Sequence, residues 1–136
     1  DFPVKVARKQ LIKEVIGIGV VFNELGEVLI DKRLPKGLLG GMWEFPGGKQ
    51  EPLEAIEETI AREIKEECDI DVEVEDLLIA LDHSYSHKKL FFVVHLCRWL
   101  SGAPKPLSSQ EVKWVKPQDL DKYPSDKSDW SLAGKE

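Results

Sequence analysis

The pattern of hydrophobic and polar positions predicts a chain built largely from strands. Residues 15–22 (VIGIGVVF) form a short, β-branched apolar run, which is typical of a buried strand. Residues 28–31 predict a second strand, and the turn at 23–27 predicts a hairpin in which Gly26 takes a positive φ. Residues 89–100 are apolar at nearly every position, so we expect a long strand that is buried on both faces.

Shorter segments complete the predicted sheet. The alternating residues 69–75 predict a strand or a connection that leads into one, and the apolar residues 77–82 predict another strand. Residues 112–115 predict a last short strand before a polar tail. A loop rich in Pro and Gly at 34–42 precedes a short extended piece at 43–45. Together with one helix between the strands, this order predicts the α/β class with a mixed sheet.

The predicted helix lies in the middle of the chain. It begins after Glu51, because Pro52 suits the first helical position, and it runs to about Cys68. A count of ~100° per residue gathers four apolar side chains on the face toward the sheet. These are Leu53, Ile56, Ile60 and Ile64.

Composition limits the class of protein. The chain has 136 residues, of which 42% are hydrophobic and 32% charged, so we expect a single folded domain over residues 1–136. No apolar run approaches the ~20 residues of a membrane-spanning helix, so no membrane partner is expected. Cys68 and Cys97 have apolar neighbours, which indicates buried free thiols and a reducing, cytoplasmic location.

The charge balance is acidic and argues against DNA binding. The chain has 25 acidic and 19 basic residues, a net charge of −6, whereas a surface that coats nucleic acid is basic. Acidic residues can nevertheless hold the metal ion that accompanies a small phosphorylated substrate. The position of the acids therefore matters more than their number.

Three acids lie at unexpected places on the predicted helix. Glu63 and Glu67 fall at the edge of the apolar face or within it, and Glu66 flanks them, at ~100° per residue. Partly buried carboxylates need a compensating charge, and Arg62 projects elsewhere on the helix by the same count. Oxygen ligands of this kind indicate Mg²⁺, with Mn²⁺ as the alternative ion. A solvated helix face remains the competing interpretation.

The loop before the helix supports the metal-site interpretation. Gly47 and Gly48 would let the backbone approach a ligand closely, and would expose carbonyl groups to a metal or amide groups to a phosphate. Lys49 follows directly, where it could reach an anion.

Residues 48–70 resemble the conserved box of the Nudix hydrolases, Gx5Ex7REUxEExGU, in which U is a bulky apolar residue. Every polar position matches, from Gly48 and Glu54 to the run at 62–67 (REIKEE). The one departure is Asp69, where the family has a glycine that ends the helix in a left-handed conformation. Asp tolerates this conformation better than most residues do.

The resemblance extends beyond the box. Residues 43–49 (WEFPGGK) are similar to the lead-in of the MutT branch, the 8-oxo-dGTP diphosphatases, and residues 31–33 (DKR) lie at a MutT-like distance before it. Residues 81–90 (LDHSYSHKKL) are similar instead to the C-terminal domain of the adenine glycosylases (MutY), which recognises 8-oxoguanine in DNA. The family resemblance implies an α/β/α sandwich with a mixed β-sheet.

The resemblance also implies a reaction and a set of residues. Nudix enzymes use Mg²⁺ to hydrolyse a nucleoside diphosphate linked to another group, and the MutT branch implies conversion of 8-oxo-dGTP to 8-oxo-dGMP and pyrophosphate, which avoids mutation. Glu63 would orient or deprotonate the water, Arg62 would orient the acids, and Gly48 and Glu54 would have structural roles. The implied metal ligands are the Gly47 carbonyl, Glu63, Glu66, Glu67 and, from a late loop, Glu111.

The sequence identifies the residues that would contact the nucleotide less completely than it identifies the metal ligands. Arg33 and Lys49 are candidates for the phosphates, and the aromatic candidates for the base are Trp43, Tyr85 and Trp130. MutT-type enzymes read the base with an Asn near the C-terminus. The only Asn here is Asn23, in an early turn, so Asp126 and Asp129 are the candidate substitutes.

The three histidines are expected to be hydrogen-bond partners rather than metal ligands. His83 and His87 flank a loop segment without partner ligands, and His95 lies in the apolar strand as a core or pocket residue.

Three functions stay open on the sequence alone. The first is a Mg²⁺-dependent nucleotide pyrophosphatase acting on 8-oxo-dGTP. The second is a non-catalytic 8-oxoguanine-recognition module, which the complete acid set opposes. The third is a Nudix pyrophosphatase for ADP-ribose, NADH or a dinucleoside polyphosphate. Either a monomer or a dimer is compatible with the sequence.

Overall fold

A computed structural model describes residues 12–36, 40–85 and 88–125 of the chain. Its elements, in chain order, are β1 (Ile12–Phe22), β2 (Val28–Lys32), β3 (Trp43–Glu44), β4 (Gly47–Lys49), α2 (Ile56–Cys68), β5 (Asp71–Tyr85), β6 (Lys88–Ser101), β7 (Glu111–Val115) and the 3-10 helix η1 (Pro117–Lys122). In the described ranges no helix has both the length and the apolar character needed to cross a membrane.

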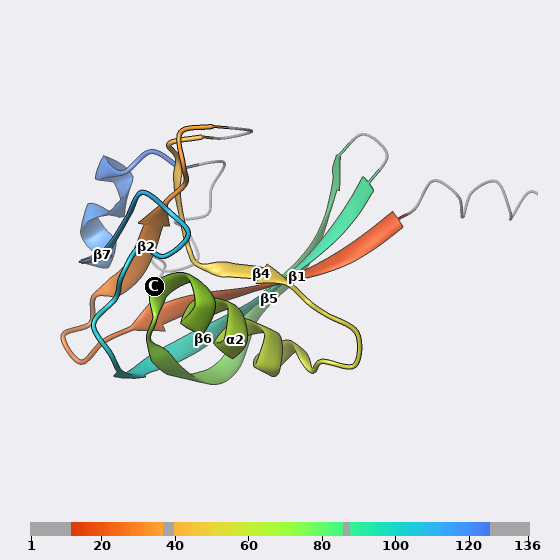
Figure 1. Ribbon diagram of the computed structural model, residues 1–136, viewed down its shortest axis with the longest axis horizontal. Coiled ribbons are helices and arrows are strands. Elements are labelled where there is room, and N and C mark those ends of the chain that lie inside the picture. Colours follow the sequence, from red (N-terminus) through yellow and green to blue (C-terminus); the bar gives the residue numbers. More distant parts are fainter. Residues whose placement is uncertain (1–11, 37–39, 86–87, 126–136) are drawn as a thin grey trace, which may run out of the picture.

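The strands form one seven-stranded mixed sheet. Its order is β3-β2-β1-β6-β5, while β4 pairs with β1 and β7 pairs with β2. The long strands β1 and β6 run parallel, whereas β5 pairs with β6 and β2 pairs with β1 in the antiparallel sense. The predicted first hairpin is confirmed, with Gly26 at φ 78° in its turn. In Figure 1, β1, β5 and β6 form an extended ribbon that reaches beyond α2.

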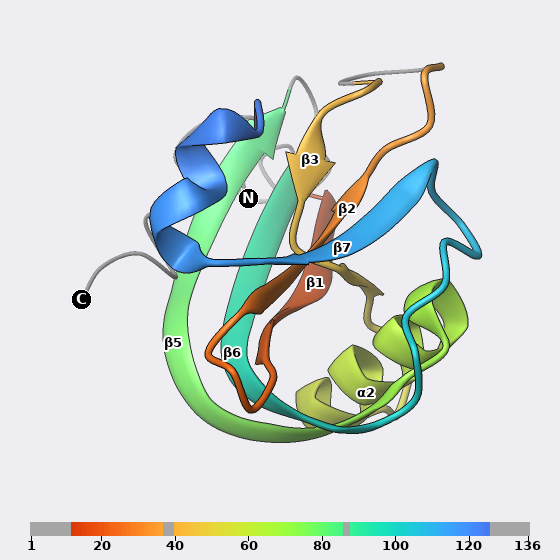
Figure 2. The ribbon, with the colours of Figure 1, turned by 90° about the vertical axis from the view of Figure 1, so that its left-hand side faces the viewer.

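Hydrophobic side chains are buried on both faces of the sheet. The cluster on the α2 side has seven buried members: Val21, Leu29, Ile60, Ile64, Cys68, Ile70 and Cys97. The cluster on the other side has eight: Val20, Val28, Ile30, Trp43, Phe45, Val94, Val115 and Leu120. Figure 2 shows α2 and η1 on opposite sides of the sheet, so the predicted sandwich with a mixed sheet is confirmed. Both cysteines are buried and free, as expected.

The start of the helix was predicted wrongly. The helix begins at Ile56 rather than after Glu51, because Glu58 Oε1 accepts a hydrogen bond from the Ala55 amide at 3.0 Å and closes the first turn there. Leu53 has φ 68° and is fully exposed, so it does not belong to the apolar face. The C-terminal end agrees with the prediction, since Asp69 takes the left-handed conformation at φ 61° and ψ 39°.

Two strand predictions also need correction. Residues 71–85 form one strand, β5, in which irregular pairing between Val74 and Ile79 takes the place of the predicted break. β6 is not buried on both faces along its length, and its buried residues are limited to Val94, His95 and Cys97. The reason is the position of the strand, because α2 covers only part of the ribbon and leaves the ends of β5 and β6 open to solvent.

Candidate active site

The strand β4 brings two glycines against the acidic face of α2. A Cβ atom at Gly48 would overlap the carboxylate of Glu63, and a Cβ atom at Gly47 would overlap the carbonyl oxygen of Gly17 on β1. Glycine is therefore the residue that allows the loop, the sheet and the Glu63 side chain to occupy this space together. Glu63 itself is mostly buried, with a side chain that is 16% exposed.

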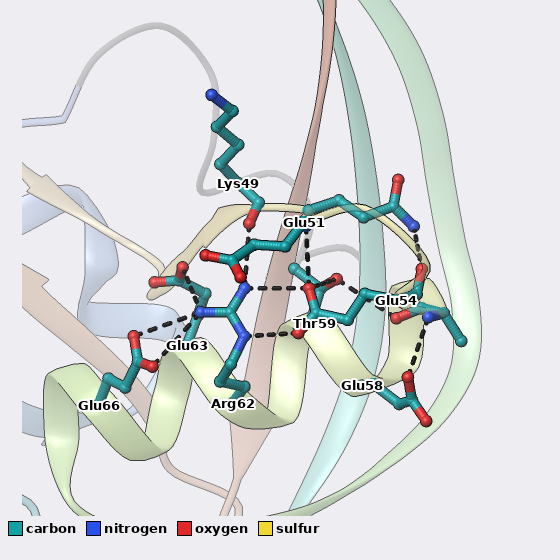
Figure 3. Close-up of polar contacts among 10 residues, drawn as sticks. Lys49, Glu51, Glu54, Glu58, Thr59, Arg62, Glu63 and Glu66 are labelled. Carbon is teal, nitrogen blue, oxygen red and sulfur yellow. Dashed lines mark hydrogen bonds and ion pairs between the residues drawn. The ribbon is translucent and has the colours of Figure 1, made fainter.

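Arg62 is the centre of the polar contacts on this helix (Figure 3). Its Nε lies 2.5 Å from Glu54 Oε2, and its Nη1 lies 3.1 Å from Glu63 Oε2 and 3.3 Å from Glu66 Oε1. Its Nη2 donates to Glu54 Oε1 at 3.0 Å and to the Lys49 carbonyl at 3.1 Å. The count of residues around the helix wrongly placed Arg62 away from the acids, because that count follows the Cβ direction and ignores the reach of a long side chain.

Glu54 holds Arg62 in place from the loop side. Its carboxylate also accepts hydrogen bonds from the Thr59 hydroxyl at 2.7 Å and from the Glu51 amide at 3.0 Å. These donors, with the Arg62 guanidinium as the largest influence, lower the pKa of Glu54 to about 2. Glu54 is thus a charged anchor between the loop and the helix, which supports the structural role that its position in the box implied.

Glu67 lies in a different environment from Glu63 and Glu66. Burial is the main cause that raises the pKa of Glu67 to about 9, and the negative charges of Asp31 and Glu63 act in the same direction. The Gly47 amide acts in the opposite direction but does not compensate. A carboxylate whose pKa is raised in this way favours a bound proton or a nearby cation.

Asp31 is the acid that the sequence analysis missed. It lies on β2, is 4% exposed, and has a pKa raised to about 8 by burial and by its neighbour Glu44, with Arg33 opposing. A signal for it was present, since Leu29 and Asp31 are two residues apart on one strand and therefore share a face. Leu29 packs in the cluster under α2, so Asp31 faces the same helix and its Glu67.

A polar pocket opens beside these acids. It has a volume of about 230 Å³ and is lined by Asp31, Arg33, Leu34, Lys36, Glu44, Glu67, Ser108 and Ser109. Arg33 Nη1 lies 3.3 Å from Glu44 Oε1 on one wall. Arg33 Nε is buried and has no hydrogen-bond partner among the described residues. A buried donor without an acceptor costs roughly 1–3 kcal/mol.

The other predicted site residues lie around the pocket rather than in it. Glu66 is 58% exposed in its ion pair with Arg62. Glu111 begins β7 opposite Lys32 on β2, with Oε2 3.7 Å from Lys113 Nζ. Lys49 is exposed and pairs with Glu14 at 3.5 Å, and Figure 3 shows its side chain pointing away from Arg62.

Trp43 packs in the core rather than at the pocket. It is 6% exposed, and its ring meets that of Tyr123 edge to face at a centroid distance of 5.2 Å. His95 is buried, with Nδ1 2.7 Å from the Glu75 carbonyl, which agrees with the expected hydrogen-bonded core residue. His83 is half-buried. The side chain of Tyr85 and all of His87, Asp126, Asp129 and Trp130 lie outside the described residues.

The donor set fits a hard divalent cation. All the candidate side-chain ligands are carboxylates, and the partly buried Glu67 lies near another carboxylate, that of the buried Asp31. Within the described ranges, no three acidic, His or Cys side chains are already gathered as a preformed site. Arg62 binds Glu63 and Glu66, while Glu67, a neighbour of Glu63, lines the pocket. Metal binding at all three would therefore require Arg62 to release part of its hold.

Comparison with known proteins agrees with this geometry. A family model described as "NUDIX domain" matches residues 17–132. The chain is 39% identical to the 8-oxo-dGTP diphosphatase of Proteus vulgaris over 82 residues, which cover 58% of this chain and 73% of that protein. It is 26% identical to the CTP pyrophosphohydrolase of Escherichia coli (strain K12) over 117 residues, which cover 83% of this chain and 84% of that one.

Among solved structures, the MutT protein from Methanosarcina mazei Go1 has the same fold. It superposes with a TM-score of 0.78 at 24% sequence identity, over 90% of this chain and 91% of that chain.

Proposed function

The chain belongs to the Nudix family of hydrolases, which act on phosphorus anhydrides, and from that premise we propose that it is a Mg²⁺-dependent pyrophosphatase of nucleoside triphosphates. The proposed preferred substrate is 8-oxo-dGTP, which would be converted to 8-oxo-dGMP and pyrophosphate, so that oxidised nucleotides are removed before they enter DNA. The observation that carries the proposal is the partly buried Glu67 of the box, which lines a pocket whose other side chains are almost all polar.

The residues of the box would have different roles in the reaction. Glu63, Glu66, Glu67 and the Gly47 carbonyl would hold the ion, and Glu111 is a further candidate. When bound, Mg²⁺ or Mn²⁺ supplies positive charge that neutralises the phosphate oxygens. Water attacks one phosphorus of the pyrophosphate linkage, and Glu63, which lies against Gly48, orients this water or accepts its proton.

Arg62 would position the acids without touching the substrate. Its contacts with Glu54 and with the Lys49 carbonyl fix the guanidinium to the loop, independently of Glu63 and Glu66. Glu63 and Glu66 can therefore turn toward a cation while Arg62 stays in place. Arg33 and Lys49 are the proposed phosphate contacts, and of the two only Arg33 lines the pocket.

A second candidate substrate is a pyrimidine triphosphate such as CTP. It is favoured by the match to the CTP pyrophosphohydrolase, which covers more of the chain than the match to the Proteus protein does. A non-catalytic recognition module is not favoured, because the chain retains every acidic residue of a working box.

A substrate panel tests the proposal. The purified protein with MgCl₂ is assayed against 8-oxo-dGTP, dGTP, CTP, ADP-ribose and NADH, and kcat/KM is compared among them. We expect the highest value for 8-oxo-dGTP, with the monophosphate and pyrophosphate as products. A higher value for CTP would replace the substrate, and hydrolysis of none of the five would refute the enzyme proposal.

Matched variants connect this activity to the box. Glu67→Gln is expected to lower kcat by several orders of magnitude, roughly the range seen when a single catalytic group is removed. Glu57→Gln, on an exposed position of the same helix, is the control and should keep the wild-type rate. A Glu67→Gln variant with near-normal turnover would place the active site elsewhere.

A further inference from the structure

The strand β5 forms the outer edge of the sheet at the end opposite β3. Among the described residues it pairs on one side only, with β6, so its other side presents backbone amide and carbonyl groups without a strand partner. Figure 2 shows β5 on the outside of the sheet, with β6 between it and β1. An edge of this kind is a template for pairing with a further strand.

The middle of this edge is apolar and exposed. Every residue from 75 to 82 is exposed, and residues 77–81 have the sequence LLIAL. The four large apolar side chains of this run, Leu77, Leu78, Ile79 and Leu81, are between 39% and 55% exposed. Single exposed leucines are common on protein surfaces, whereas a contiguous apolar run on an open edge indicates a binding surface.

Only the first half of this edge is protected against pairing. Proteins protect open edges with charged side chains, proline or β-bulges. The irregular pairing between Val74 and Ile79 has this effect on the first half of β5. Residues 79–85 pair regularly with β6, and they contain a single carboxylate, Asp82, and no lysine, arginine or proline. The second half of β5 is therefore the part of the edge that can accept a strand.

The charges beside the run favour a second copy of this chain over a basic partner. Arg98 pairs with Glu73 and with Glu75, and Lys13 Nζ lies 3.8 Å from Asp82 Oδ1. These acids are already compensated within the chain, so a basic peptide would have to displace Arg98 or Lys13 to gain from them. A second copy instead brings an equal apolar run together with acids that are compensated in the same way.

From these observations we infer that β5 pairs with β5 of a second copy, in the antiparallel sense, around a two-fold axis at Leu81. In such a symmetric pair the same edge is used by both copies. An axis at Asp82 would set two carboxylates opposite each other, which is destabilising. An axis at Leu81 sets the two Leu81 side chains opposite each other and Asp82 opposite Ala80. It also sets Ile79 opposite His83, and all these positions belong to the regular part of the edge.

The dimer is expected to be weak and reversible. A single pair of strands buries less surface than the ~1,200 Å² at which standard protein interfaces begin. The residues that line the pocket beside Glu67 include none from β5, so the pairing leaves the pocket of each copy open.

Sedimentation velocity of the full chain from about 1 μM to about 1 mM tests the inference. We expect a reversible change from the monomer mass to twice that mass. Leu81→Lys sets two ammonium groups opposite each other at the axis, so it should raise the dissociation constant about tenfold or more. Leu25→Lys is the matched control, because Leu25 is exposed in the turn between β1 and β2, and it should keep the wild-type constant. Thermal melts at about 1 μM, where the chains are monomeric, separate a loss of pairing from a loss of the fold.

Cysteine cross-linking tests the position of the axis. Leu81→Cys, treated with the thiol oxidant diamide, should form a disulfide-linked dimer, because opposed residues of antiparallel strands have Cα atoms ~4.5–5.5 Å apart. In Ser84→Cys the two thiols would lie on residues ~20 Å apart along the paired strands, so this control should not cross-link. The native Cys68 and Cys97 are buried and should not contribute.

Three results would refute the pairing. The first is a chain that stays monomeric over the whole concentration range, as it would if its own terminal residues covered the edge. The second is a dissociation constant that Leu81→Lys changes less than twofold. The third is cross-linking of Ser84→Cys as readily as of Leu81→Cys.

Discussion

Replacing Glu67 with Gln is expected to stabilise the metal-free protein while it removes the activity. The carboxyl of Glu67 has a pKa raised to about 9 in the fold, mainly by burial, against a usual value of 4.5. The folded protein therefore keeps a proton that the unfolded chain releases above pH 4.5. Since the unfolded chain binds fewer protons in this range, the free energy of unfolding falls as the pH rises from 4.5 and levels off above about 9.

The size of the effect follows from the same values. A difference of one bound proton changes the free energy of unfolding by about 1.4 kcal/mol per pH unit. Between pH 4.5 and pH 7 the wild type therefore loses about 3 kcal/mol of this free energy through Glu67. Gln has nearly the shape of the protonated acid but does not ionise, so the variant should recover most of this free energy. For a domain of this length that is a rise in Tm of roughly 10 °C. Asp31, whose pKa is raised to about 8, gives an effect of the same sign.

Thermal unfolding in EDTA and in MgCl₂ measures this effect. In EDTA at pH 7 we expect Glu67→Gln to melt above the wild type and above Glu57→Gln, the exposed control. Addition of MgCl₂ should raise the Tm of the wild type more than that of Glu67→Gln, because a cation stabilises the ionised acids. Equal melting temperatures in EDTA, or a wild-type Tm that is constant between about pH 5 and 9, would refute the reasoning.

Two further predictions concern the contacts that support the helix. Arg62→Ala should lower the free energy of unfolding by about 1–2 kcal/mol and kcat more than tenfold, since the hydrogen bonds to Glu54, Glu63 and the Lys49 carbonyl are lost together. Arg62→Lys should restore little of the free energy of unfolding or of kcat, because lysine lacks the planar guanidinium. Full recovery of kcat in a steady-state assay of this variant would contradict the positioning role. Asp69→Gly should raise the urea midpoint by an amount equivalent to about 1 kcal/mol, since Gly adopts the left-handed conformation at this position without a steric cost. An unchanged or lower midpoint would mean that the exposed ion pair of Asp69 with Lys105 outweighs the conformational gain.

The sequence predicted the parts of the fold that depend on local pattern. The turn at Gly26 and the left-handed end of the helix at Asp69 follow from the conformational preferences of single residues, and both are present. The start of the helix was predicted wrongly because two local signals competed. Pro52 suits a first helical position, but the Ala55 amide is satisfied by Glu58, so the helix begins four residues later than Pro52.

The sequence could predict only the part of the candidate site that lies on one element, the helix α2. The spacing of Glu63 and Glu67 on a single helix placed both near its buried face, and in the structure Glu63 is mostly buried and Glu67 partly buried. Asp31 and Ser108 come from segments far away in the sequence, and only the pairing of β2 with β7 and the ties of residues 107–110 bring them to Glu67. No helical or strand periodicity contains this information, because it belongs to the order of strands in the sheet.

The acids of the site fall into two groups that differ in how their negative charge is compensated. Glu54 is stabilised in its charged form by Arg62, whereas burial destabilises the charged forms of Glu67 and Asp31. The charge of Asp31 adds to the effect at Glu67, and the charge of Glu44 adds to the effect at Asp31. A helix with all its acids neutralised by arginine would have no capacity left for a metal ion, and a helix with none neutralised would lose stability at neutral pH. Arg62 compensates Glu54, which fixes the loop, and also pairs with Glu63 and Glu66, whereas Glu67 and Asp31, which have no such partner in these contacts, line the pocket. The free energy that a cation would gain at this site is therefore concentrated where the proposed phosphates would lie.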